Sequence, residues 1–175
     1  MLVIICGLPG TGKSTLAKTL AEKIGAATIS SDSIRMQILE QRTYSEKEKE
    51  IVYEEMFKKA GNLLANGKSV ILDATFYKKN YREKAKAHAE KAKTDFFIIE
   101  CTTDERVLKK RLFSRTKKTS ESEADFAVYK KVKELFEPIS EPHLIVDTSL
   151  PLEKQVQLVE KYLGVWNERE GHQGA

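Results

Sequence analysis

Residues 7–15 read GLPGTGKST and stand between an apolar run, LVIIC, and an amphipathic stretch, LAKTLAEKIG. Three glycines and a proline in nine residues are incompatible with a regular helix or strand. The stretch fits the pattern G-x-x-x-x-G-K-[ST], with Gly7, Gly12, Lys13 and Ser14 at its fixed positions. It lies directly after a predicted strand and directly before a predicted helix, so we interpret it as a phosphate-binding loop of the Walker A kind.

The glycines of this loop have a physical purpose. Without side chains the backbone can curl into a nest whose N–H groups point at one phosphate, and a helix beginning near Lys13 adds its positive end. Lys13 is expected to reach the terminal phosphates and Ser14 to coordinate Mg²⁺. The alternative is a glycine-rich turn that only reverses the chain. The residues expected at the nucleotide are Gly7, Leu8, Pro9, Gly10, Thr11, Gly12, Lys13, Ser14 and Thr15.

Around this loop, short apolar runs alternate with longer amphipathic stretches. The runs rich in β-branched and aromatic residues predict strands at 2–6, 26–30, 69–73, 95–101 and 143–147. Helices are predicted at 13–24, from a capping box of Ser45 and Glu48 to Gly67, and at about 80–93, 104–117, 123–136 and 151–163. This alternation predicts an α/β layer structure around a parallel sheet, as a single domain over residues 1–164. The tail 165–175 is expected to fray.

Composition narrows the class of protein. With 41% hydrophobic and 32% charged residues, the 175-residue chain has the profile of a soluble globular protein. A count of 30 basic against 26 acidic residues suits an anionic ligand but is too mild to indicate a nucleic-acid binder. No apolar run reaches the ~20 residues of a membrane span, and the start lacks the basic segment of a secretory signal. We therefore expect a cytoplasmic protein without membrane contact, whose Cys6 and Cys101 are buried thiols rather than a disulfide.

The phosphate-binding loop alone does not distinguish a switch, a motor and a kinase. A guanine-nucleotide switch would carry D-x-x-G and N-K-x-D, but no N-K-x-D occurs and neither Asp32 nor Asp73 is followed by glycine at that spacing. A motor would need more chain to couple nucleotide state to mechanical work. A small kinase needs only an acceptor site and a lid, so the sequence favours a kinase.

The second predicted strand leads into SSDSIR, which places Asp32 and Arg35 just beyond its carboxyl end. In an open α/β sheet, ligands bind at that edge. Asp32 would accept the proton of an attacking hydroxyl, or orient the hydroxyl and bind Mg²⁺ through water. Arg35 would bind an anionic group of the acceptor with both arms of its guanidinium. The alternative is that Ser-Asp-Ser caps a helix that begins near Ser33.

The third predicted strand, in VILDAT, ends with Asp73. A carboxylate at this position is typical of the Walker B arrangement, so we expect Asp73 beside the metal and the substrate. The alternative is an ordinary aspartate that caps the following loop. Residues 76–84, FYKKNYREK, mix aromatic and basic side chains, which would suit either a nucleic-acid end or the packed first turn of a surface helix.

Residues 109–118 read KKRLFSRTKK, with six basic residues and no acidic one. Arg111 and Arg115 are four residues apart and would share one helix face. Both would neutralise the charge that develops on the transferring phosphoryl group. The segment at about 109–125 is predicted to close as a lid that excludes water. The alternative is a solvated basic helix face, which fits the lysines of this segment better than its arginines.

Five segments in order resemble one family: GLPGTGKST, SSDSIR, VILDATF, KKRLFSR and FEPISEPHLIVDTS. The chain is similar to small P-loop kinases that include the kinase domain of phage polynucleotide kinase and predicted kinases related to zeta toxins and adenylylsulfate kinases. The resemblance implies a three-layer α/β fold, with a parallel five-stranded sheet in the order 2-3-1-4-5 and helices on both faces. It also implies ATP and Mg²⁺ as cofactors.

The resemblance assigns roles to individual residues. It implies Lys13 and Ser14 at the nucleotide and the metal, Asp32 in acceptor activation and Arg35 in acceptor binding. It implies Arg115, together with Arg111, at the transferring phosphate. It also places Thr148 and Ser149 near the adenine. The chain departs from the polynucleotide kinase pattern after the third predicted strand, where Thr75-Phe76 replaces Thr-Asn, so the acceptor stays open.

Two functions follow from the sequence. The favoured one is a kinase that transfers the γ-phosphoryl group of Mg-ATP to a hydroxyl of an anionic acceptor, with a 5′-hydroxyl polynucleotide, a nucleoside and a small metabolite as candidates. Nucleic acid is thus one possible partner among several. The alternative is a nucleotide-binding module or weak ATPase that acts through a protein partner. Turnover stimulated by an acceptor distinguishes the two.

Overall fold

The computed structural model describes residues 1–41, 43–114 and 126–165 of the chain. Within these residues, five strands form one sheet in which every pairing is parallel, in the order β2-β3-β1-β4-β5. This confirms the strand order expected from the sequence. The strands are β1 (Leu2–Cys6), β2 (Ala27–Ser30), β3 (Val70–Asp73), β4 (Phe96–Thr102) and β5 (Leu144–Asp147).

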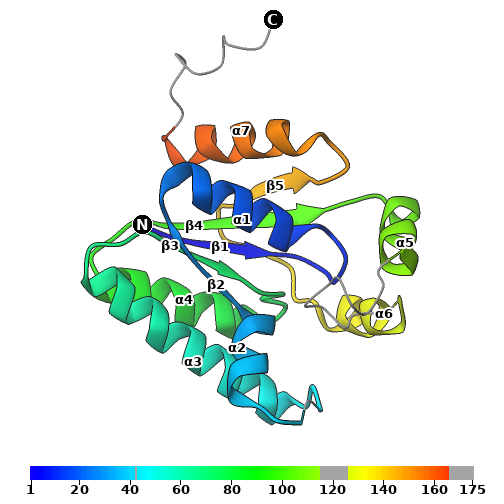
Figure 1. The fold of residues 1–175 in the computed structure, drawn as a ribbon, viewed down its shortest axis with the longest axis horizontal. Coiled ribbons are helices and arrows are strands. Elements are labelled where there is room, and N and C mark those ends of the chain that lie inside the picture. Colours follow the sequence, from blue (N-terminus) through cyan, green and yellow to red (C-terminus); the bar gives the residue numbers. More distant parts are fainter. Residues whose placement is uncertain (42, 115–125, 166–175) are drawn as a thin grey trace, which may run out of the picture.

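Helices cover both faces of the sheet, as expected (Figure 1). Helices α1 and α7 lie over one face, and α3 and α4 lie over the other. Helices α5 and α6 lie beyond the carboxyl ends of the strands, to which the arrowheads point. The helices are α1 (Lys13–Ile24), α2 (Ser31–Ile38), α3 (Glu46–Ala65), α4 (Lys79–Lys91), α5 (Glu105–Ser114), α6 (Phe126–Leu135) and α7 (Leu152–Leu163).

The central strand β1 shows how the sequence specifies the layers. All five of its residues are buried, because helices cover both faces of the sheet at this point. Leu2 and Ile4 contribute to the core beneath α3 and α4, whereas Val3 and Ile5 contribute to the core beneath α1 and α7. A strand covered on both sides therefore reads as a continuous apolar run. The phosphate-binding loop begins directly after it.

A small third core attaches α5 and α6 to this loop. It consists of Leu108 and Leu112 from α5 and Tyr129 from α6, with Leu8 of the loop and Phe126 packed against it. The ring centroids of Phe126 and Tyr129 are 5.5 Å apart. Because Leu8 belongs to this cluster, the loop is in direct contact with the two helices at the end of the sheet.

Several element ends follow local signals in the sequence. Gly25 and Gly164 end α1 and α7 in the left-handed conformation, with φ of 66° and 70°. Helix α2 was predicted only as an alternative, and it begins at Ser31 rather than near Ser33. The helix that the alternative expected is therefore present, but its cap residue is Ser30 and Asp32 lies in its first turn.

The predicted capping box at the start of α3 is only half correct. The Ser45 hydroxyl accepts a hydrogen bond from the Glu48 amide, as expected. The Glu48 carboxylate does not return this bond to the Ser45 amide and instead contacts Thr43, Tyr44 and Arg35. The reason is competition for partners, because Thr43, Tyr44 and the buried Arg35 donate to the carboxylate while the Ser45 amide donates to the Thr43 hydroxyl at 3.4 Å.

Three predictions concern residues outside the described part of the chain: Arg115, the lid beyond Ser114, and the tail from residue 166. Among the described residues, no helix combines the length and the apolar character needed to cross a membrane. Cys6 and Cys101 are free thiols in this structure, and both are buried, as expected.

Candidate functional site

The phosphate-binding loop connects the end of β1 to the start of α1 in a backbone shape that requires glycine. Gly7, Gly10 and Gly12 have φ values of 132°, 85° and 87°. A Cβ atom on Gly7 would also lie 2.4 Å from the carbonyl oxygen of Cys101 on the neighbouring strand. The glycines are therefore needed for two reasons: they allow the backbone to turn, and they let the loop pass close to β4.

The start of α1 has the electrostatics of an anion site. No acidic side chain stands in its first turn among the described residues, and its cap residue is Gly12. The backbone N–H groups at this end carry the positive end of the helix dipole. Ser14 and Thr15 are exposed here. The Lys13 ammonium folds back and donates to the carbonyl oxygen of Leu8 at 2.9 Å.

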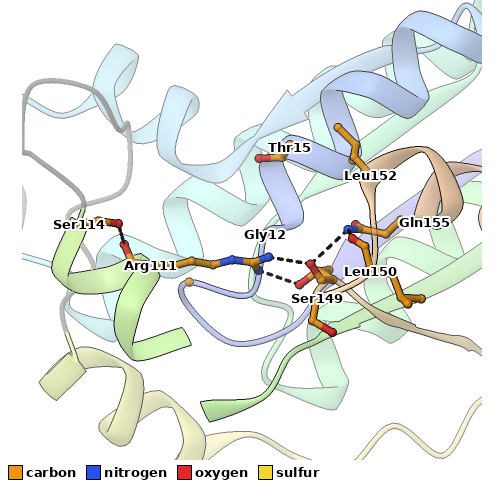
Figure 2. Close-up of a pocket in the computed structure, with 10 residues that line it drawn as sticks. Gly12, Thr15, Arg111, Ser114, Ser149, Leu150, Leu152 and Gln155 are labelled. Atoms are coloured by element: carbon orange, nitrogen blue, oxygen red, sulfur yellow. Dashed lines mark hydrogen bonds between the residues drawn. The ribbon is translucent and has the colours of Figure 1, made fainter. Parts of the chain in front are cut away.

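A cavity of about 450 Å³ adjoins the loop and the start of α1. Its walls come from the loop, from the first turns of α1 and α7, from α5 and from the segment between β5 and α7 (Figure 2). It is lined by Gly10, Gly12, Thr15, Arg111, Ser114, Thr148, Ser149, Leu150, Leu152 and Gln155. Its lining mixes backbone, hydroxyl and apolar groups with one guanidinium, which suits a ligand with a flat apolar part and an anionic part.

Arg111 reaches this cavity from α5 and passes Gly12 toward the segment that holds Ser149 (Figure 2). Its Nη1 donates to the Thr148 hydroxyl at 2.9 Å, and its Nη2 donates to the Thr148 carbonyl at 2.6 Å. The Thr148 hydroxyl donates in turn to the carbonyl of Thr11 in the loop at 2.6 Å. The structure therefore joins Arg111, Thr148 and the loop, and it places Thr148 and Ser149 at the cavity wall.

The second group of predicted residues lies on α2. Asp32 and Arg35 form an ion pair, with Nη1 and Oδ1 3.1 Å apart. The Arg35 side chain is only 8% exposed and its Nε donates to Glu48 Oε1 at 2.7 Å. The Tyr44 ring lies 4.7 Å from the guanidinium carbon. Arg35 is thus held between two carboxylates and an aromatic ring, and its contact with an acceptor anion stays a prediction.

Glu48 is a residue of this site whose role sequence reasoning missed. Its Oε2 accepts from the Thr43 amide at 2.6 Å, the Thr43 hydroxyl at 2.8 Å and the Tyr44 amide at 2.8 Å. Burial alone would raise the pKa of Glu48, but the hydrogen bonds from Thr43, Arg35 and Tyr44 together hold it below the ordinary value of 4.5. The only signal in the sequence, a glutamate three residues after Ser45, was interpreted as a helix cap.

Asp73 lies at the end of β3 and is 4% exposed. The register pairs it with Ile5 of β1 and with Ser30 of β2. The carboxyl ends of these three strands therefore lie at one edge of the sheet, where the loop and α2 begin. The carboxylate of Asp73 and the exposed hydroxyl of Ser14 are hard oxygen donors of the kind that Mg²⁺ accepts together with phosphate oxygens and water. Among the described residues, no three His, Cys, Asp or Glu side chains cluster into a metal site of their own.

The stretch after Asp73 is packed rather than exposed. Phe76 has a positive φ of 48°, its amide donates to the Tyr53 hydroxyl at 2.8 Å, and its carbonyl accepts from Arg82 at 2.9 Å. Arg82 is 1% exposed and also donates to the Pro138 carbonyl at 2.9 Å. This supports the interpretation of residues 76–84 as the packed start of a helix. Phe76 is held in a strained conformation close to the site by partners from α3 and α4.

The two cysteines near the loop are not reactive groups. Burial raises the pKa of Cys101 to about 12 and raises that of Cys6 further. Both thiols therefore remain neutral near pH 7, because the thiolate is disfavoured in an apolar surrounding. This burial argues against a thiolate nucleophile at either cysteine, and the described part of the site offers hydroxyl, carboxylate and basic groups.

Comparison with known proteins gives the family. The model of an AAA domain family, AAA_33, matches residues 2–139. The chain belongs to this family. This AAA domain is also similar to an uncharacterized protein of Mycobacterium tuberculosis, at 33% identity over 138 residues that cover 72% of the chain and 28% of the relative. The chain therefore spans little more than a quarter of the length of the curated relatives it matches.

Solved structures share the fold of this AAA domain. A sugar kinase from Janibacter sp. superposes with a TM-score of 0.74, at 15% identity and with 94% of each chain covered. An APS kinase of Mycobacterium tuberculosis, in complex with AMPPNP and APS, gives a TM-score of 0.71 at 21% identity and covers 93% of this chain and 96% of that one. The parallel sheet in the order 2-3-1-4-5, with its flanking helices, is the P-loop kinase fold.

Proposed function

We propose that the protein is an ATP-dependent kinase that transfers the γ-phosphoryl group of Mg-ATP to a hydroxyl acceptor. The single observation that carries the proposal is the junction of the loop with the cavity. The glycine-lined start of α1 provides amides for phosphates, and a cavity of about 450 Å³ opens beside it with room for the nucleoside. The P-loop kinase fold supports the same assignment by analogy.

In this proposal the loop residues 7–15 bind the triphosphate through their backbone N–H groups. Lys13 exchanges its contact with the Leu8 carbonyl for the terminal phosphates, since a phosphate oxygen is a stronger acceptor for an ammonium than a carbonyl. Arg111 supplies a second cation at the cavity wall. The segment of Thr148 and Ser149 faces the nucleoside. Arg115 is proposed to act with Arg111 on the transferring group, as the sequence predicts.

Mg²⁺ is expected between the Ser14 hydroxyl and Asp73, which end in hard oxygen donors at the same edge of the sheet. Once bound, the ion would neutralise phosphate charge and fix the orientation of the phosphates. The chain itself contributes the two oxygens and the burial of Asp73, which keeps that carboxylate in one place.

Asp32 is proposed as the group that accepts the proton of the acceptor hydroxyl. Asp32 lies in the first turn of α2, directly after the carboxyl end of β2. In the sheet, β2 is the neighbour of β3, and β3 is the neighbour of β1, which leads into the loop. Arg35 holds the carboxylate from one side at 3.1 Å and thereby sets its orientation. A carboxylate held in one orientation beside the acceptor is placed to take the proton of its hydroxyl.

The acceptor is proposed to be a hydroxyl compound, with a 5′-hydroxyl polynucleotide, a nucleoside and a small metabolite as the candidates. The sugar kinase and the APS kinase with the same fold add sugars and APS to the compounds worth testing.

We further propose that residues 1–164 act as one kinase domain in the cytoplasm. Two free, buried thiols support a reducing compartment.

The test uses labelled ATP and a panel of these acceptors. Asp32→Asn is expected to lower the rate of transfer to the best acceptor by about 10²–10⁴-fold, while the Kd of Mg-ATP changes little. Lys13→Ala is expected to weaken Mg-ATP binding itself. Asp95→Asn, which alters an exposed aspartate just before β4 at the opposite edge of the sheet, is the matched control. Transfer that survives Asp32→Asn unchanged would refute the role of Asp32, and ATP binding without turnover on any acceptor would favour a nucleotide-binding module.

A further inference from the structure

We propose that the Thr148 hydroxyl is a positioning group that holds Arg111 and the phosphate-binding loop in register with each other. The inference rests on the proposed function, because the ligand it concerns is the phosphate chain of a nucleotide. It differs from the role near the adenine expected for Thr148. Here the residue acts on the anionic end of the ligand through two other parts of the chain.

Thr148 is buried, and hydrogen bonds hold its backbone in place. It follows β5 directly, is 2% exposed, and its amide donates to the Thr102 carbonyl of β4 at 2.9 Å. Its carbonyl accepts from Gln155 of α7 at 3.2 Å, and the same Gln155 nitrogen donates to the Leu150 carbonyl at 2.7 Å. The backbone at Thr148 is therefore fixed to the sheet on one side and to α7 on the other.

One oxygen of this fixed residue joins two functional parts. The Thr148 hydroxyl has a single proton, which it donates to the Thr11 carbonyl at the shorter distance of 2.6 Å, while the Thr102 carbonyl lies 3.1 Å away. A lone pair of the same oxygen accepts from Arg111 Nη1 at 2.9 Å. Because a hydroxyl that donates becomes a better acceptor, the two bonds reinforce each other.

The position of Arg111 depends on this residue. Both of its terminal nitrogens donate to Thr148, Nη1 to the hydroxyl oxygen and Nη2 to the carbonyl oxygen. The guanidinium is also pressed against the loop, since a Cβ on Gly12 would lie 3.3 Å from Nη1. Without the hydroxyl, a long and flexible side chain would lose one of the two contacts that fix its plane.

The consequence is a specific effect on phosphate recognition. Removing the hydroxyl releases one arm of Arg111, which lines the cavity together with Gly12 at the start of α1, and it also releases the Thr11 carbonyl in the phosphate-binding loop. Groups that bind phosphate are then less well placed, whereas the nucleoside end of the cavity keeps its shape. The affinity for ligands that carry phosphate should fall more than the affinity for adenosine.

The experiment compares Thr148→Val, which keeps the shape of the side chain, with Thr148→Ser, which keeps the hydroxyl. Calorimetry measures the Kd of Mg-ATP and of adenosine for each protein, and their ratio is the readout. Thr148→Val is expected to lower this preference for Mg-ATP about tenfold, and Thr148→Ser is expected to restore most of it. General damage to the fold would weaken both ligands equally and leave the ratio unchanged, which would overturn the proposal.

A second comparison tests whether Thr148 acts through Arg111. In an Arg111→Gln background, adding Thr148→Val is expected to change the ratio about threefold rather than tenfold, because the contact with Arg111 is already lost and only the contact with the Thr11 carbonyl remains. A full tenfold additional loss there would overturn the proposed link. Arg111→Lys, in which one ammonium nitrogen replaces the planar pair of nitrogens that meets the two Thr148 oxygens, tests the same link if Thr148→Val does not fold. If the wild-type protein binds no Mg-ATP, the proposed function fails together with this inference; if it binds and the ratio is unmoved, only the inference fails.

Discussion

Replacing Glu48 by glutamine tests the cluster that holds Arg35 on the acceptor side of the site. Glutamine has nearly the same size but only one accepting oxygen. In the native protein Oε2 accepts three hydrogen bonds from Thr43 and Tyr44, and Oε1 accepts one from Arg35 at 2.7 Å. The amide oxygen of glutamine can accept either from Thr43 and Tyr44 or from Arg35, so its NH₂ group must face the donors that remain.

The less costly choice keeps the oxygen toward Thr43 and Tyr44 and turns the NH₂ group toward Arg35. This removes one charge-assisted hydrogen bond, worth about 1.5–3 kcal/mol, and places two donors against each other. Asp32 still pairs with the guanidinium, which limits the cost of a buried charge left with one partner. We therefore expect Glu48→Gln to lower the free energy of unfolding by about 2–3 kcal/mol at pH 7.

Urea unfolding followed by circular dichroism measures this difference, with Glu50→Gln, at an exposed position on the same helix, as the control. The pH dependence gives a second check. Because the pKa of Glu48 lies below 4.5 in the folded protein, its carboxylate stabilises the fold fully above about pH 5, and this is lost as the pH falls through the folded pKa. The gap between the two proteins should narrow in acid. A gap under 0.5 kcal/mol at pH 7, or one that widens in acid, would refute the reasoning.

Two further predictions concern the loop and the start of α3. Gly7→Ala should destabilise the protein by at least about 3 kcal/mol in thermal unfolding, because its Cβ would lie 2.4 Å from the Cys101 carbonyl oxygen. The control is Gly61→Ala on a regular helix, where the nearest atom is 3.6 Å away, and it should be neutral or stabilising. Equal effects of the two substitutions would contradict this prediction. Hydrogen bonds from Lys49 and Lys78 lower the pKa of Glu46 to about 2, so the free energy of unfolding should fall as the pH drops from 4.5 to 2. Lys49→Met should raise the pKa of Glu46 in an NMR titration. A Glu46 that titrates near 4.5 in the native protein would show that these contacts do not persist in solution.

The candidate site was predictable to different degrees for a physical reason. The loop is contiguous in sequence, and its function requires glycines at fixed spacing, so GLPGTGKST identifies it without a fold. The position of Asp32 and Asp73 at one edge of the sheet follows from parallel strands alone. The partners of Arg35 and Arg111 could not be found in this way, because Glu48 is 13 residues from the first and Thr148 is 37 residues from the second. No periodic pattern connects residues at such separations.

The sequence by itself determined the order of strands and helices, the two-sided burial of β1 and the shape of the loop. These depend on local propensity, on the period of apolar residues and on the freedom of glycine at positive φ. Only the tertiary structure decided that Glu48 serves Arg35 rather than its own helix end, and that one buried hydroxyl, on Thr148, joins Arg111 to the loop. Such choices are made by competition between donors and acceptors that meet only after the layers have packed, and in a buried site each group must take the partner that is within reach.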